Sequence, residues 1–264
     1  MPSERSVVVD IGDMPVRLST QDAPLIDLLR ERYGPFLNAA ARPRFDFAIS
    51  VVEPGELDGD PDLQVRASDG CWRLARADFR AEWSTHTGRG AIFQTRNPYT
   101  VDSVLRILHS VILSTEGGFL LHAASVVRAG HAAVFTGPSG AGKTTLAGLA
   151  PRSATLLSDE ISYVRGTPAG YVAYGTPFAG ELGQAGEPVS APLAAIYALE
   201  HGTNTVDRLG TAEALRTLLR NVLFFSDDAA LTERLFRFCC ECAQEIPMYR
   251  LAFRPDERAW DLVA

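Results

Sequence analysis

The sequence contains the stretch Gly137-Pro138-Ser139-Gly140-Ala141-Gly142-Lys143-Thr144, which matches the pattern G-x-x-x-x-G-K-[ST] at every fixed position. An apolar run, Ala132 to Thr136, precedes it and predicts a strand, and Lys143 to Leu149 predicts a helix. In that setting glycines let backbone N–H groups close around phosphate oxygens, and the helix N-terminus adds positive potential. The stretch therefore predicts a phosphate-binding loop for a nucleoside triphosphate.

Two side chains of this loop have specific expected roles. Lys143 would reach the β- and γ-phosphates of ATP, and the Thr144 hydroxyl would ligate Mg²⁺. Of the 25 basic residues in the chain, Lys143 is the only lysine, and it stands where a phosphate loop needs a compact ammonium group. We expect ATP and Mg²⁺ as cofactors, and the predicted nucleotide-binding residues are Gly137, Ser139, Gly140, Ala141, Gly142, Lys143, Thr144 and Thr145.

Three further residues could take part in chemistry beside the loop. Asp159 follows the apolar step Thr155 to Leu157, and an acid at such a strand end holds magnesium or polarises the nucleophile in phosphate-loop proteins. Glu160 comes next and would point the other way if the strand continued. His122 lies in an apolar strand one strand before the loop, where a histidine is by itself more often a core residue than a catalytic one.

The stretches 118–125, 135–147 and 156–160 together resemble the HPr kinase/phosphorylase family. More narrowly, they resemble the HPr-kinase-like proteins of bacterial biosynthetic clusters, such as lasso peptide precursor kinases. The resemblance implies a fold similar to the nucleotide domain of phosphoenolpyruvate carboxykinase. It also implies that Asp159 is the general base, that His122 supports it, and that Glu181 is a second carboxylate for the metal, although the segment around Glu181 could equally be a plain turn. The acidic pair is Asp-Glu here and commonly Asp-Asp in that family.

The expected activity is that of an ATP- and Mg²⁺-dependent kinase acting on a hydroxyl. A serine or threonine of a peptide or small protein is the first expectation for the acceptor, and a small molecule such as free serine is the second. HPr itself is not expected, because the C-terminal part lacks the family's HPr-docking signature. A nucleotide-dependent switch or binding protein without phosphotransfer remains the alternative. Arg208 and Arg220 are both candidates to contact the transferring phosphate.

We expect an α/β fold with two parts. Residues 1–98 predict a β-rich α+β region and are a candidate for acceptor recognition, and residues 99–264 predict a phosphate-loop kinase domain of the HPr kinase and carboxykinase type. In the first part, the predicted elements are a hairpin around Gly12-Asp13, a helix ending at Gly34-Pro35, and strands at 47–52, 64–67, 71–74 and 91–95. In the second part, the predicted strands are 119–127, 132–136, 155–157, 193–199 and 249–253, with helices from 101 to Gly117-Gly118, at 211–224 and at 228–243.

The composition narrows the function classes. Hydrophobic residues make up 46% and charged residues 22%, and the net charge is −7, which disfavours nucleic-acid binding. Residues 1–10 lack the pattern of a signal peptide, and no run of 18 apolar residues predicts a membrane span. We therefore expect a cytoplasmic protein without a membrane partner. Cys239, Cys240 and Cys242 lack a second cysteine pair or a nearby histidine to complete a metal site, so we expect them to pack within a helix. A homo-oligomer is compatible with this sequence.

Overall fold

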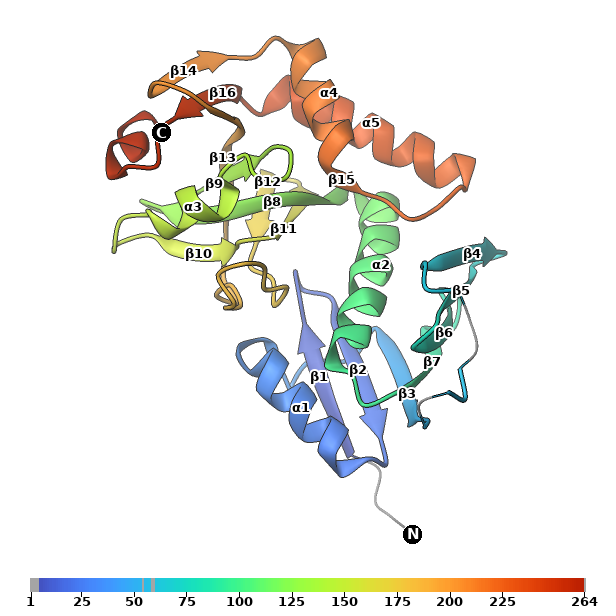
Figure 1. The fold of residues 1–264 in the computed structure, drawn as a ribbon. Helices are drawn as coiled ribbons and strands as arrows, with labels where there is room; N and C mark the ends of the chain where they lie inside the picture. The colour runs from blue at the N-terminus through green and yellow to red at the C-terminus, as the bar shows by residue number, and fades with distance from the viewer. Residues whose placement is uncertain (1–4, 54, 58–59, 264) are drawn as a thin grey trace. The chain divides into compact units, whose positions relative to one another are not determined.

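The computed structural model describes residues 5–53, 55–57 and 60–263 (Figure 1). The first four residues, part of the segment judged to lack a signal peptide, lie outside the described residues. The chain is a mixed α/β protein that divides into two compact units. One unit contains the chain up to Leu108 together with 225–228, and the other contains 109–224 and the chain from Ala229. This division runs inside helix α2 (Pro98–Glu116), whereas the sequence suggested a boundary at its start.

The first unit is built on a seven-stranded sheet in the order β1-β2-β3-β7-β6-β5-β4. The predicted hairpin around Gly12 and Asp13 is confirmed, since both residues have positive φ between two antiparallel strands. Asp22 caps the predicted helix by accepting the N–H of Leu25 at 2.8 Å. The elements are β1 (Arg5–Asp10), β2 (Pro15–Thr20), α1 (Ala23–Tyr33), η1 (Gly34–Phe36), β3 (Phe45–Val51), β4 (Gln64–Ser68), β5 (Cys71–Arg76), β6 (Phe79–Ser84) and β7 (Arg89–Gln94).

The second unit is built on a nine-stranded sheet in which two long strands change partners. Strand β8 pairs with β11 through its first half and with β9 through its second half, and β13 pairs with β12 and then with β9. Since β11 also pairs with β12, these five strands close a ring. The strands are β8 (Gly118–Arg128), β9 (His131–Thr136), β10 (Thr155–Ser158), β11 (Ile161–Thr167), β12 (Gly170–Tyr174), β13 (Ser190–His201), β14 (Thr205–Arg208), β15 (Val222–Leu223) and β16 (Met248–Phe253).

Helices and core side chains cover this sheet. Helices α4 (Thr211–Asn221) and α5 (Ala229–Glu245) lie side by side (Figure 1), and the short α3 (Lys143–Gly148) and η2 (Glu257–Leu262) complete the unit. Cys239 and Cys242 of α5 are buried in the apolar core, as predicted, and burial raises the pKa of the Cys239 thiol to about 12. No helix in the described part of the chain has the length and apolar character needed to cross a membrane.

Three strands of the second unit that position the site, β9, β13 and β16, were predicted from the sequence, but their pairing with one another was not. β9, β13 and β16 are neighbours and run parallel, so their carboxyl ends meet at one edge of the sheet. β10 ends at Ser158 and β11 begins at Ile161, so the strand does not continue through Glu160, and the condition under which Glu160 would point away from Asp159 is not met. Physically, the two acids occupy the tight connection between antiparallel neighbours of β8.

Candidate functional site

The glycine loop lies at the carboxyl ends of the three parallel strands and is shaped by close contacts with two of them. Gly142 has φ +94°, and a Cβ atom there would lie 2.7 Å from Phe253 Cζ, at the end of β16. Gly137 has φ +156°, and its Cβ would lie 3.2 Å from the Leu199 carbonyl oxygen of β13. Gly140 has φ +78° with no atom within 4 Å of a Cβ. Gly142 and Gly137 therefore seat the loop, whereas Gly140 faces open space.

Lys143 points its ammonium group into the loop. Its Nζ donates hydrogen bonds to the carbonyl oxygens of Gly137, at 3.1 Å, and Pro138, at 3.2 Å, and the residue is buried. Burial lowers the pKa of Lys143 below its ordinary value, and the carboxylate of Glu181 acts in the opposite direction. The chain's single lysine is thus held where a phosphate bound by the loop would meet it.

The turn that carries Asp159 is fixed by hydroxyl groups. Ser158 Oγ accepts the N–H groups of Glu160, at 3.2 Å, and Ile161, at 2.9 Å. Thr176 Oγ1 donates to the Ile161 carbonyl oxygen at 2.9 Å, so a neighbouring segment ties down the same turn. These bonds turn the chain sharply after β10 and bring Asp159 and Glu160 to the same cavity.

A loop after β12, residues 176–187, holds the Asp159 carboxylate. Gly180 N–H donates to Oδ1 and Leu182 N–H donates to Oδ2, both at 2.8 Å, and Asp159 is 3% exposed. A Cβ at Gly180 would lie 3.0 Å from Asp159 Oδ2, so only glycine fits this approach without displacement. Both carboxylate oxygens are therefore oriented by backbone donors, and each keeps capacity to accept another hydrogen bond. Glu181 lies between the two donor residues.

These parts enclose a cavity of about 440 Å³, here called the acid cavity. It brings together all the predicted catalytic and metal-binding residues: Lys143, Thr144, His122, Asp159, Glu160 and Glu181. Its other lining residues are Ser139, Gly140, Gly142, Thr145, Ala179 and Gly180, of which Ala179 and Gly180 were not predicted. His122 contributes from the middle of β8, and its carbonyl oxygen accepts the Thr136 hydroxyl at 3.0 Å.

A second cavity of about 560 Å³, here called the arginine cavity, lies against the loop residues Gly137 to Ala141. Gly137 and Ala141, both predicted to bind nucleotide, line this cavity and not the acid cavity. The arginine cavity is completed by the end of β13, by α4 and by Arg250. Of the two arginines proposed to contact phosphate, Arg220 lines it, whereas Arg208 lines neither cavity. His201 Nε2 lies 2.9 Å from the Gly140 carbonyl oxygen and joins β13 to the loop.

Mg²⁺ would have to be held here by few protein ligands. Within residues 5–53, 55–57 and 60–263, no three His, Cys, Asp or Glu side chains are grouped to hold a metal ion by themselves. Mg²⁺ that arrives with a nucleotide keeps several waters and is usually bound by one or two carboxylates plus substrate phosphates. Thr144 and the carboxylates of the acid cavity are the side chains that fit this arrangement.

Comparison with known proteins assigns a family but no activity. No curated protein matches the chain. A family model described as "SynChlorMet cassette protein ScmC" matches residues 96–263, which is more than half of the chain and includes the glycine loop and both cavities. The chain therefore belongs to the ScmC family of SynChlorMet cassette proteins.

Proposed function

We propose that this chain is an ATP- and Mg²⁺-dependent kinase that phosphorylates a hydroxyl group, first of all a serine or threonine of a peptide or small protein. One observation carries the proposal: the acid cavity combines the phosphate loop with Asp159, Glu160, Glu181 and His122. A protein that only binds nucleotide has no need of a carboxylate beside the γ-phosphate that accepts an acceptor's proton. The finer fold assignment, a phosphate-loop core of the HPr kinase and carboxykinase type, belongs to the same proposal.

The glycine loop would bind the phosphates of ATP, and the acidic side chains would bind Mg²⁺. Backbone N–H groups of the loop and Lys143 would hold the phosphates, with the Thr144 hydroxyl and nearby carboxylates of Glu160 and Glu181 available to Mg²⁺. Bound Mg²⁺ would neutralise charge that develops on the phosphate oxygens. We expect the reaction to take place in the cytoplasm, where ATP is supplied.

Asp159 is the residue we propose as the general base. The acceptor oxygen forms a bond to the γ-phosphorus, the bond between that phosphorus and the β–γ bridging oxygen breaks, and the hydroxyl proton passes to Asp159. Its fixed orientation, with both oxygens held by backbone N–H groups, is what a positioned base requires. His122, which lines the same cavity from β8, would support the base or orient the acceptor.

The family description offers a place to look for the acceptor. Members are described as cassette proteins, so we propose that a peptide encoded in the same cassette is the acceptor. A small hydroxyl compound such as free serine is the second candidate, and a nucleotide switch is the alternative without transfer. A peptide kinase yields a phosphopeptide, a small-molecule kinase yields a phosphorylated small compound, and a switch yields neither. Incubation with ATP and each acceptor therefore distinguishes the three.

The test is Asp159→Asn, measured for both binding and turnover. General-base help is typically worth ~10²–10⁴ in rate, or about 3–5 kcal/mol of barrier, so single-turnover phosphorylation of cassette peptides at saturating MgATP should fall by that factor. Calorimetry should show MgATP affinity close to normal. If Asp159 is chiefly a magnesium ligand, affinity falls instead. Normal turnover at saturation would remove Asp159 as the base.

Two controls make this test specific. Asp207→Asn removes an exposed carboxylate on β14 that lines neither cavity, and it should leave both quantities unchanged. Asparagine also offers only one acceptor oxygen to the N–H groups of Gly180 and Leu182, so thermal unfolding of the variant must be followed. If wild-type protein binds MgATP tightly but phosphorylates none of the acceptors, the result would favour the nucleotide switch.

A further inference from the structure

The arginine cavity contains cationic groups that the proposed reaction does not use. Arg216 and Arg220 are one helical turn apart on α4 and line the cavity together. Both are exposed, and among the described residues neither guanidinium has an ion-pair or hydrogen-bond partner. The opposite face of α4 is anchored by the buried Ala214 and Leu218. The helix therefore presents two uncommitted guanidinium groups to the cavity.

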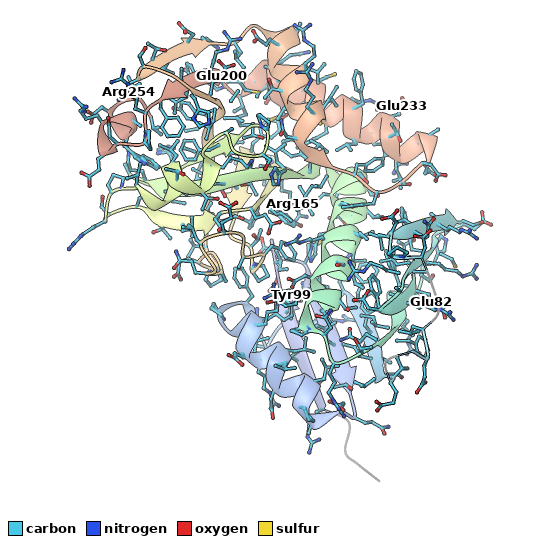
Figure 2. All side chains as sticks on the ribbon, viewed as in Figure 1. Glu82, Tyr99, Arg165, Glu200, Glu233 and Arg254 are labelled. Atoms are coloured by element: carbon cyan, nitrogen blue, oxygen red, sulfur yellow. The ribbon has the colours of Figure 1, made fainter. Side chains whose placement is uncertain are left out.

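Arg250, in the same cavity, is bound differently. Its guanidinium forms an ion pair with Glu200 at 3.2 Å and a second one with Glu213 (Figure 2, where Glu200 is labelled). Both carboxylates are ion-paired to Arg250, and in the described part of the chain no acid forms an ion pair with Arg216 or Arg220. With three arginines and two glutamates, the lining has a charge of 3 − 2 = +1 in a chain whose net charge is −7. The cavity is a local positive site on an acidic protein.

The phosphates of the nucleotide are expected in the acid cavity and not in the arginine cavity. Lys143, Thr144 and Thr145 line only the acid cavity, and the residues shared by both cavities are Ser139 and Gly140. Phosphates held by Lys143 and Thr144 would therefore lie on the acid side of the loop. The arginine cavity is left for an anion that arrives with another molecule, close to the exposed tip of the loop.

We propose that the arginine cavity binds an acidic side chain of the acceptor, through Arg216 and Arg220. This inference rests on the proposed kinase function and adds a substrate class to it: peptides with glutamate or aspartate near the phosphorylated hydroxyl. The planar guanidinium fork matches a carboxylate in a two-bond geometry, which lysine would not provide. The acidic surface elsewhere on the chain would repel such a peptide and so favour binding at this cavity.

The experiment uses the full chain saturated with MgADP and two fluorescein-labelled hexapeptides. One consists of glutamates with a single serine, and the other has glutamine in place of every glutamate. Anisotropy should show that wild-type protein prefers the glutamate peptide. A hydrogen bond to a charged group is worth about 1.5–3 kcal/mol, so the double variant Arg216→Gln/Arg220→Gln should bind it about 10- to 100-fold more weakly.

The control variant is Arg234→Gln/Arg237→Gln, which removes the same two charges from an exposed part of α5 outside both cavities. It should keep the preference for the glutamate peptide. The proposal is overturned if wild-type protein does not prefer that peptide, or if both double variants lose it equally. It is also overturned if Arg216→Gln/Arg220→Gln weakens MgATP binding instead, which would assign the arginines to the nucleotide. Failure of wild-type protein to bind MgATP at all would contradict the proposed function separately.

Discussion

The acid cavity and the arginine cavity share Ser139 and Gly140 but are built in different ways. In the acid cavity, Lys143 and Asp159 are buried and their polar atoms are bound by backbone groups of the loops around them. In the arginine cavity, Arg216 and Arg220 are exposed on long side chains. Fixed groups suit a reaction, since catalysis depends on the position of each atom, and adaptable groups suit recognition of a varied partner.

The comparison also shows how the loop separates the two sides. Gly142 belongs to the acid cavity and is pressed against Phe253, whereas Gly140 belongs to both cavities and has open space beside it. A substitution at Gly142 should disturb the structure of the loop. A substitution at Gly140 should mainly alter what the loop can bind.

Alanine at these two glycines gives the largest expected difference in stability. Both have positive φ, which costs about 1–2 kcal/mol for alanine. Gly142→Ala adds a clash with Phe253, and overpacking of this kind costs about 1–3 kcal/mol more. Urea unfolding should therefore rank Gly142→Ala as the less stable protein. Equal free energies of unfolding would mean that the loop is not seated on β16 as described.

A smaller effect concerns pH and separates the lysine from the arginines. The pKa of Lys143 is lowered by burial, so its ammonium loses its proton at a lower pH than an ordinary lysine. MgATP affinity, measured by calorimetry at increasing alkaline pH, should fall as this proton is lost. Binding of the glutamate peptide should persist over the same range, because guanidinium groups stay charged.

The variant Glu181→Gln sharpens this pH prediction. The Glu181 carboxylate raises the pKa of Lys143, so its removal should lower that pKa further and move the loss of MgATP affinity to lower pH. Glu187→Gln is the matched control, since Glu187 is exposed in the same loop and lines neither cavity. A profile that is unchanged in Glu181→Gln would show that Lys143 does not govern the pH dependence.

The sequence predicts the parts of the site that are local along the chain. The glycine loop is visible in the sequence because strand, glycines, lysine and helix follow one another without interruption, and Asp159 is visible because it comes directly after an apolar strand. The direction in which Glu160 points could not be predicted. The Ser158 hydroxyl turns the chain after β10, and no periodicity of the sequence encodes the hydrogen bonds that it accepts. Strand β6 was not predicted, although its buried Phe79, Ala81 and Trp83 alternate with polar residues as in a half-buried strand.

The features of the site that could not be predicted depend on contacts between segments far apart in the sequence. The 176–187 loop binds Asp159 through backbone N–H groups, which any residue can supply, so only Gly180 carries a sequence signal there. The meeting of α4 with the glycine loop depends on the packing of the sheet, and so the arginine cavity could not be predicted. The role of the first unit in acceptor recognition and the oligomeric state stay predictions.

The most direct measurement is calorimetric titration of MgATP into wild-type protein and Lys143→Ala. The wild type should bind one nucleotide per chain. The variant should lose affinity by about 10- to 100-fold or more, since a hydrogen bond to a charged group contributes about 1.5–3 kcal/mol. Arg208→Ala, outside both cavities, should match the wild type, and thermal unfolding should show that both variants are folded. Equal affinities in wild-type protein and Lys143→Ala would contradict nucleotide binding at this loop.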